Sequence, residues 1–339
     1  MIKKLFIACA AFVWTIALVA QNISVVNSSG STKLYRTLEA AIKGADPNSV
    51  IYLPGGGFPI ADSVKITKKL TIIGIGHKAK NDNADGVTTI SGNLFFNQGS
   101  SGSAVMACYI TGNVNIGEGG ASVNDVLIRY CNLNSVQVNN SICMGTIVNQ
   151  NYIRSTSNFH GANGEFTNNI AHSIDDIDNG TIAYNVFTSA CTGYHTHNSG
   201  NWDNAAIIFC NQCAITHNII IEWGSGGPSS GSLGNGSTNT VYDNMATQNW
   251  GEDCINVSKE GFDWKNVFKD YQGVSATSNF HFKEEYAEHE GKVGIYAGDS
   301  FNDKQLAPVP YIVAKKIDEQ TDAAGKLNIK IRVKASGEE

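Results

Sequence analysis

A pair of adjacent carboxylates, Asp175 and Asp176, is the first feature of this sequence that could do chemistry. Two carboxyl groups can divide the work of general acid and general base. We therefore take Asp175 and Asp176 as candidate catalytic residues. The acidic run continues to Asp178, so a solvated turn or a weak Ca²⁺-binding loop is an equal alternative.

Two histidines, His195 and His197, stand two residues apart, so a strand would carry both on one face. With Asp203 nearby and Glu222 further along the chain, they could ligate a metal ion. Histidines on a solvent-facing loop are the commoner case, so the metal stays unassigned. We place His195 in the candidate catalytic set, and His197 and Glu222 in the candidate substrate-binding set. No cofactor is predicted beyond the Ca²⁺ that an acidic loop could hold.

Two tryptophans, Trp202 and Trp223, complete the candidate substrate-binding set. Aromatic faces held on a rigid scaffold stack well on sugar rings. Trp250 and Trp264 could extend the same line, and packing beneath inserted loops is the alternative for all four.

The element that must position these residues is a repeat. An apolar residue is followed three places later by Asn or Cys, and two places after that by another small or apolar residue. Successive central residues are separated by 20, 18, 16, 33 and 26 positions, which indicates a repeat of variable length. The copies are Ile128–Cys131–Leu133, Val148–Asn151–Ile153, Phe166–Asn169–Ala171, Ile182–Asn185–Phe187, Ile215–Asn218–Ile220 and Val241–Asn244–Ala246.

Each copy predicts two short strands joined by a polar bend. Stacked bends can bond their side-chain amides to one another as an Asn ladder, and stacked repeats share one continuous core. Leucine-rich and helical repeats are excluded, because neither their leucine pattern nor a 3.6-residue period accompanies the copies. A strict six-residue period, which a left-handed β-helix would need, is also absent. We predict a right-handed parallel β-helix whose two long insertions, 189–204 and 224–237, form a lip near the same turn.

The two ends of the repeat carry a family resemblance. Leu34–Ile42 predicts an amphipathic helix that caps the solenoid, and Leu70–Gly76 followed by Thr88–Gly92 predicts the first coils. These segments resemble the opening of secreted pectate-lyase-like β-helix proteins. Residues 280–313 resemble the last coil of the same proteins.

The resemblance implies a polysaccharide lyase or a glycoside hydrolase, and each activity makes a demand on the sequence. A lyase of this family uses an Arg or Lys base beside Ca²⁺ or cationic side chains. Only Arg129 and Arg154 are available in the repeat, and we expect both to be solvated surface residues. A polygalacturonase-like enzyme would add Gly-His-Gly and Arg-x-Lys motifs, which do not occur near Asp175 and Asp176.

The 339 residues divide into three predicted parts: a targeting segment at 1–20, the β-helix at 21–305, and a tail with a terminal strand at 306–339. Between residues 81 and 258 there are 13 acidic residues, two Arg and no Lys, a balance of 2 − 13 = −11. This charge disfavours nucleic acid and anionic membranes as partners. No second apolar stretch is long enough for a stable membrane span.

Seven cysteines follow the leader, and an odd number cannot all pair. Cys210 and Cys213 have metal or redox spacing, but Cys131 replaces the repeat asparagine, which favours buried structural thiols. We expect a secreted, periplasmic or cell-surface protein that binds or acts on a polysaccharide or cell-surface glycan. The alternative is a non-catalytic surface or adhesive solenoid that binds glycan or protein.

Overall fold

The computed structural model describes most of the chain that follows the predicted targeting segment. The described residues are 22–78, 86–188, 206–221, 238–247, 251–257, 263–272, 275, 277–317, 320–321 and 324–334.

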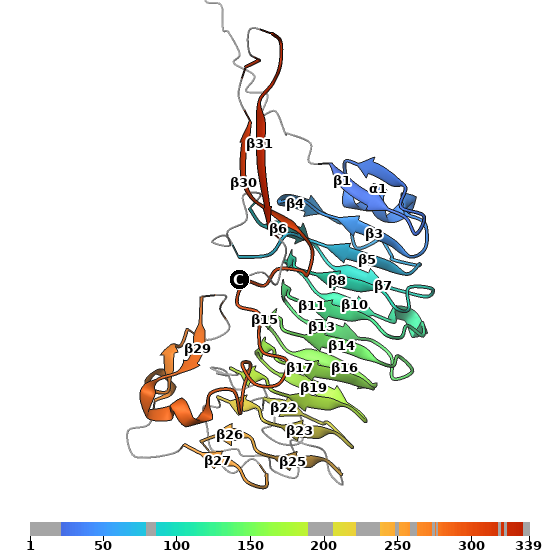
Figure 1. The fold of residues 1–339 in the computed structure, drawn as a ribbon. Helices are drawn as coiled ribbons and strands as arrows, with labels where there is room; N and C mark the ends of the chain where they lie inside the picture. Colours follow the sequence, from blue (N-terminus) through green and yellow to red (C-terminus); the bar gives the residue numbers. More distant parts are fainter. Residues whose placement is uncertain are drawn as a thin grey trace, which may run out of the picture.

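These residues form an all-β structure dominated by three long sheets of parallel strands (Figure 1). In spatial order, sheet A contains β2 (Thr32–Tyr35), β1 (Ile23–Val26), β3 (Ser49–Tyr52), β5 (Leu70–Ile73), β8 (Ala104–Met106), β11 (Leu127–Arg129), β14 (Thr146–Asn149), β17 (Gly164–Thr167), β20 (Thr181–Ala183), β23 (Ala214–Thr216) and β25 (Thr240–Tyr242). Sheet B contains β4 (Gly56–Pro59), β6 (Thr88–Ser91), β9 (Tyr109–Ile110), β12 (Asn132–Leu133), β15 (Tyr152–Ile153), β18 (Ile170–Ala171), β21 (Val186–Phe187), β24 (Ile219–Ile220), β26 (Met245–Ala246) and β27 (Ile255–Asn256). Sheet C contains β7 (Leu94–Phe96), β10 (Val114–Ile116), β13 (Val136–Val138), β16 (Ser157–Ala162), β19 (Ile174–Ile177) and β22 (Ile207–Ile208).

The chain visits the sheets in a fixed order, and we call one strand from each sheet a circuit. After β11, for example, it enters sheet B at β12 and sheet C at β13, and it returns to sheet A at β14. Each of these strands pairs in parallel with the equivalent strand of the next circuit. The arrangement is compatible with the predicted parallel β-helix.

The predicted asparagine column is confirmed. Asn151, Asn169, Asn185, Asn218 and Asn244 are buried one above another, and each Nδ2 donates to the Oδ1 of the next at 3.0–3.1 Å. The same oxygens accept backbone N–H groups of the preceding circuit. Each amide of the column therefore satisfies backbone groups of a tight bend between sheets A and B.

The bend itself needs a left-handed residue just before each member of the column. The residues at this position have φ between 52° and 60°: Tyr130, Gln150, Asn168, Tyr184, His217 and Asp243. Non-glycine residues rarely adopt this conformation. The hydrogen bonds of the following asparagine offset the backbone strain.

Cys131 occupies the column as predicted, with its backbone N–H donating to Asn151 Oδ1 at 2.9 Å. Burial raises the pKa of its thiol to about 12, and burial raises that of Cys108, one circuit earlier, well above its usual value. Thiols this hard to ionise are poor nucleophiles and poor metal ligands. Cys213 is also buried, and its Sγ donates to the Ile177 carbonyl at 3.2 Å.

Helix α1 (Leu38–Gly44) lies at the N-terminal end of the sheets (Figure 1). It begins later than predicted because the side chain of Thr37 accepts the Ala40 N–H and fixes the first turn. Leu34 and Tyr35 belong instead to β2. The apolar face is as predicted, since Leu38, Ala41 and Ile42 are buried in the main core.

The end of the chain differs from the predicted last coil. Residues 264–301 contain η2 (Trp264–Asn266), the antiparallel pair of β28 (Phe268–Asp270) and β29 (Asn279–Phe282), and η3 (Glu284–His289). Their apolar side chains form a second core with Tyr152, Ile170, Val186, Ile219 and Met245, which sheet B presents on its outer face. The segment that resembled another coil therefore packs on the outside of the preceding circuits.

A strap, residues 293–309, then runs back along the bend between sheets A and B. Gly294 N–H donates to the His217 carbonyl at 2.7 Å, and Asn168 Nδ2 donates to the carbonyls of Ile295 and Ala297 at 3.0 and 2.7 Å. Further along, Gln150 Nε2 donates to the Asp299 carbonyl at 2.8 Å. Residue numbers increase along the strap while those of its partners decrease. The strap therefore crosses the circuits in the reverse of their order in the sequence.

Beyond the strap, β30 (Tyr311–Ile317) and β31 (Ile329–Lys334) form an antiparallel hairpin that extends away from the three sheets (Figure 1). Ile329, Ile331 and Val333 alternate along β31 and are each more than half exposed. The short 3-10 turn η1 (Glu118–Gly120) completes the described elements.

Candidate functional site

A row of polar side chains crosses the outer face of sheet C. Asn115, Gln137, Asn158 and Asp175 occupy the same register on β10, β13, β16 and β19. Their chain neighbours Val114, Val136, Ser157 and Ile174 are buried, and alternate strand residues point to opposite faces, so the row points outward. We call these four residues the polar row.

A bulge in β16 brings His160 to the end of this row. The β16–β19 register shifts between Asn158 and Ala162, which oppose Asp175 and Ile177. The four residue steps from Asn158 to Ala162 in β16 therefore lie opposite only two steps in β19. The two extra residues are accommodated at His160 and Gly161, whose φ angles are 47° and 74°. His160 Nδ1 lies 2.9 Å from the Val138 carbonyl oxygen, which fixes the ring beside the acidic pair.

Asp175 is the most perturbed carboxyl group of this surface. Its Oδ2 accepts Asn158 Nδ2 at 2.7 Å, whereas its Oδ1 is buried without a hydrogen-bond partner. Burial, reinforced by the charge of Asp176, raises the pKa of Asp175 to about 6, and the charge of His160 opposes the rise. A carboxyl group that holds its proton near neutral pH can act as a general acid.

Asp176 follows Asp175 in β19 and has a left-handed backbone conformation, with φ of 58°. Burial and the charge of Asp178 raise the pKa of Asp176, and His160 again opposes the rise. The structure therefore brings the two predicted carboxylates together with Asp178 and His160. Sequence reasoning missed His160, because nothing in the sequence marks the bulge that places it.

The polar row was also missed, although the sequence carries a signal for it. Counting from the column residue of the same circuit, the row lies at 115 − 108 = 7, 137 − 131 = 6, 158 − 151 = 7 and 175 − 169 = 6. A polar residue six or seven places after each bend was therefore visible in the repeat. Only the pairing of sheet C shows that these positions align.

The two arginines of the repeat are not solvated as expected. Arg154 is half-buried, donates to Asn132 Oδ1 and to the carbonyls of Ile110 and Thr111, and covers the Tyr109 ring. Arg129 lies over the Tyr130 ring and pairs with Asp299 of the strap at 3.3 Å. Arg154 ties neighbouring circuits together and Arg129 ties the strap to its circuit, so neither is held ready as the base of a lyase.

Several predicted site residues lie outside the described part of the chain. These are His195, His197, Trp202, Asp203, Glu222, Trp223 and Trp250. The chain re-enters the described structure at β22, where Ile207 and Ile208 pair with Ile174 and Asp175.

Trp264 does not extend the proposed aromatic line. It is 4% exposed and stacks on Phe268 with ring centroids 5.7 Å apart and an 8° angle between planes. It is buried in the second core, so the packing alternative is the correct one for this tryptophan.

Metal binding has no support from the described side chains. Within the described ranges, no group of three His, Cys, Asp or Glu residues is arranged to hold a metal ion. The predicted set of His195, His197, Asp203 and Glu222 lies outside those ranges, so it stays a prediction.

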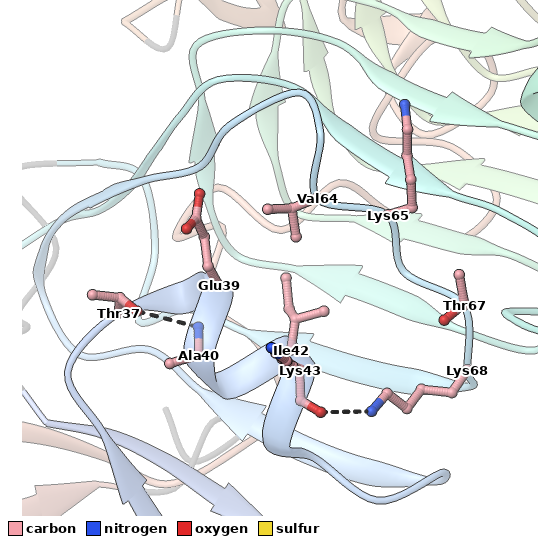
Figure 2. A pocket seen from close by; sticks show the side chains of 9 residues that line it. All are labelled: Thr37, Glu39, Ala40, Ile42, Lys43, Val64, Lys65, Thr67 and Lys68. Atoms are coloured by element: carbon pink, nitrogen blue, oxygen red, sulfur yellow. Dashed lines mark hydrogen bonds between the residues drawn. The ribbon is translucent and has the colours of Figure 1, made fainter.

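A pocket of about 610 Å³ lies at the N-terminal end, between α1 and residues 64–68 (Figure 2). Two of the lysines that line it, Lys65 and Lys68, have partners inside the protein. Lys68 Nζ donates to the carbonyls of Lys43 and Ala45 at 3.0 and 2.6 Å, and Lys65 pairs with Glu118 at 2.5 Å. These contacts stabilise the last turn of α1 and the neighbouring loop.

Comparison of the chain with protein families, curated proteins and solved structures gives no match. Among the described residues, no helix has the length and apolar character needed to cross a membrane.

Proposed function

We propose that this chain is an exported right-handed parallel β-helix protein that binds a polysaccharide along the outer face of sheet C. In this proposal α1 and β2 cap the N-terminal end, and the pectate-lyase-like resemblance reflects a shared architecture. The polar row, which is the observation that carries the proposal, supports a linear ligand because successive amides follow the parallel strands at about 4.8 Å.

The chemistry of the row suits a chain of hydroxyl groups. Amide groups bind hydroxyl groups as donors and acceptors, and the bonds that Asn115, Gln137 and Asn158 donate within the protein fix the orientation of these amides. Phe95 precedes Asn115 in the same register, but its ring is buried beneath the Lys65 ammonium, which lies 3.4 Å from the ring centroid, so the polar row begins at Asn115. Amide and carboxylate groups in one line can bond successive sugar hydroxyls.

Asp175 favours a glycoside hydrolase over a lyase if the protein is an enzyme. A carboxyl group whose pKa lies near 6 is a suitable proton donor to a glycosidic oxygen, with Asp176 as the second carboxylate. A lyase would need a free cationic base, and Arg129 and Arg154 are engaged elsewhere. His195, His197, Trp202, Trp223 and Glu222 are proposed to complete the site from the insertions.

A non-catalytic glycan-binding or adhesive protein is the second candidate. The observation that favours it is the row itself, since three of its four members are amides, which bind sugars but transfer no protons.

A polysaccharide panel tests the proposal. The purified mature chain is screened with and without Ca²⁺ for retarded migration in glycan gels and for new reducing or unsaturated ends. Binding without product supports the adhesive protein, and new reducing ends that disappear in Asp175→Asn support the hydrolase. Neither binding nor product from any polysaccharide would contradict both.

A further inference from the structure

A second cluster of titratable side chains lies on the far side of the molecule from the polar row, where β29 meets the strap. His281 belongs to β29, Glu290 follows η3, and Tyr296 and Asp303 belong to the strap. No motif in the sequence links these four residues, and the proposed glycan surface does not use them.

Glu290 fixes the position and the proton of the His281 ring. Glu290 Oε1 lies 2.7 Å from His281 Nδ1, and Glu290 Oε2 accepts the Phe282 N–H at 2.9 Å. A carboxylate held at both oxygens can only accept, so a neutral imidazole donates its Nδ1 proton and keeps the Nε2 lone pair. Tyr296 stacks on the ring at 3.7 Å with a 4° angle between planes, which sets its orientation.

The exposed nitrogen points toward a second carboxylate. Asp303 Oδ2 lies 3.9 Å from His281 Nε2, and Tyr296 donates its hydroxyl proton to Asp303 Oδ1 at 2.9 Å. The side chains of His281 and Asp303 are 35% and 59% exposed, so water and a ligand can reach both. Two acceptors at this spacing converge on one hydroxyl group or water molecule.

The strap also has many contacts outside the cluster. Asn168 and Gln150 already bond four strap groups, Arg129 pairs with Asp299, and His77 Nε2 lies 3.3 Å from Gln305 Oε1. Ala307 packs against Ile73, Ala107 and Tyr130. The exposed acid–imidazole–acid arrangement is therefore free to serve a chemical role besides its contacts with the strap.

We propose that His281 is a general base for the hydrolysis of neutral esters, with Glu290 as its positioning residue. Nε2 takes a proton from water while the water oxygen bonds to the ester carbonyl carbon. The carbon–oxygen bond to the alcohol then breaks, and the alcohol oxygen recovers the proton from Nε2. The intermediate imidazolium lies between two carboxylates, which stabilise it, and the same charges repel anionic substrates. This site does not depend on the glycan surface.

Hydrolysis of p-nitrophenyl acetate by the full mature chain tests the proposal. We expect saturable turnover that falls about 100-fold in His281→Gln, a typical contribution of a general base. His289→Gln is the matched control, because His289 also lies beside a carboxylate, 3.6 Å from Glu288, in the same segment. Its turnover should equal that of the wild type.

Two further variants separate catalysis from folding. Asp303→Asn changes one exposed carboxylate and should lower kcat about tenfold with KM unchanged, and Glu290→Gln should do the same while the melting temperature stays measurable. Turnover no higher than that of equimolar free imidazole, or wild-type turnover in His281→Gln, would overturn the proposal. If His281→Gln fails to fold, wild-type kcat in Asp303→Asn overturns it instead.

Discussion

Asn169 illustrates how one buried amide holds two circuits together. Its Oδ1 accepts both the backbone N–H and the Nδ2 of Asn151, at 2.9 and 3.1 Å, and its Nδ2 donates to the Val148 carbonyl at 2.8 Å. A side chain without an amide leaves these buried groups without partners. The column therefore stabilises the fold, and each asparagine contributes through its own hydrogen bonds.

Replacing Asn169 by Ala should lower the free energy of unfolding by about 3 kcal/mol, because each orphaned buried backbone group costs about 1–3 kcal/mol. Urea denaturation followed by circular dichroism measures the change. Asn139→Ala is the control, since Asn139 is exposed and makes only a 3.3 Å bond to the Gln137 carbonyl. Equal stabilities of the two variants would show that the column contributes nothing specific.

Asp175 makes stability depend on pH with a defined sign. Its folded-state pKa of about 6 lies above the unfolded value of about 3.8, so folding favours the protonated form. The wild type should lose stability relative to Asp175→Asn as the pH rises from about 4 through about 6, and the difference should then stay constant. We expect about 1 kcal/mol, since the carboxyl group is partly screened by solvent.

Thermal melts of both proteins at pH 4 and pH 8 measure this difference. The comparison is internal, because every other titrating group is common to the two chains. A wild type that gains stability relative to Asp175→Asn on going from pH 4 to pH 8 would contradict the assigned direction.

The strap is an element whose docking can be tested at one glycine. Gly294 has φ of 71°, and a Cβ there would collide with the buried side chain of Ile219. Gly291 has φ of 73° and open space around it. Alanine at either position carries the same backbone strain, so the difference between the variants isolates packing.

Gly294→Ala should be about 1–3 kcal/mol less stable than Gly291→Ala, the usual cost of overpacking a core. Trypsin should also cleave Gly294→Ala faster after Lys304, as the strap lifts from the bend. Cleavage rates and urea midpoints that match between the two variants would mean that the strap does not rest on Ile219.

The strands and bends of the repeat could be predicted because each copy carries the same short sequence pattern. Asn at a tight bend and apolar residues on either side give the column at 151, 169, 185, 218 and 244 and the strands around it. The position of His160 could not be predicted from the sequence, because the bulge in β16 shifts the register after Asn158 without a local signal. The last coil expected at residues 280–313 was wrong, because β29 pairs antiparallel with β28, and only the contacts of Phe268, Phe280 and Phe282 show that this segment packs on sheet B. The terminal strand predicted in the tail is present as β31.

At the scale of the whole molecule, the three sheets divide their tasks. The outer face of sheet B from β15 to β26 is covered by apolar side chains of residues 264–301, and the strap lies along the bend between sheets A and B. Sheet C carries the aligned polar row. The acidic balance of −11 between residues 81 and 258 agrees with a neutral rather than an anionic ligand.

The affinity of a double variant on sheet C tests the central claim most directly. Asn115→Ala/Gln137→Ala removes two amides of the polar row without touching Asp175, and Glu165→Ala/Thr181→Ala removes two paired positions of sheet A as the matched control. Affinity electrophoresis against a polysaccharide that the wild type retains should show binding about 30-fold weaker for the sheet C variant, from two lost hydrogen bonds of about 1 kcal/mol each, and unchanged for the control. Wild-type affinity in the sheet C variant, or an equal loss in the control, would contradict the proposed surface.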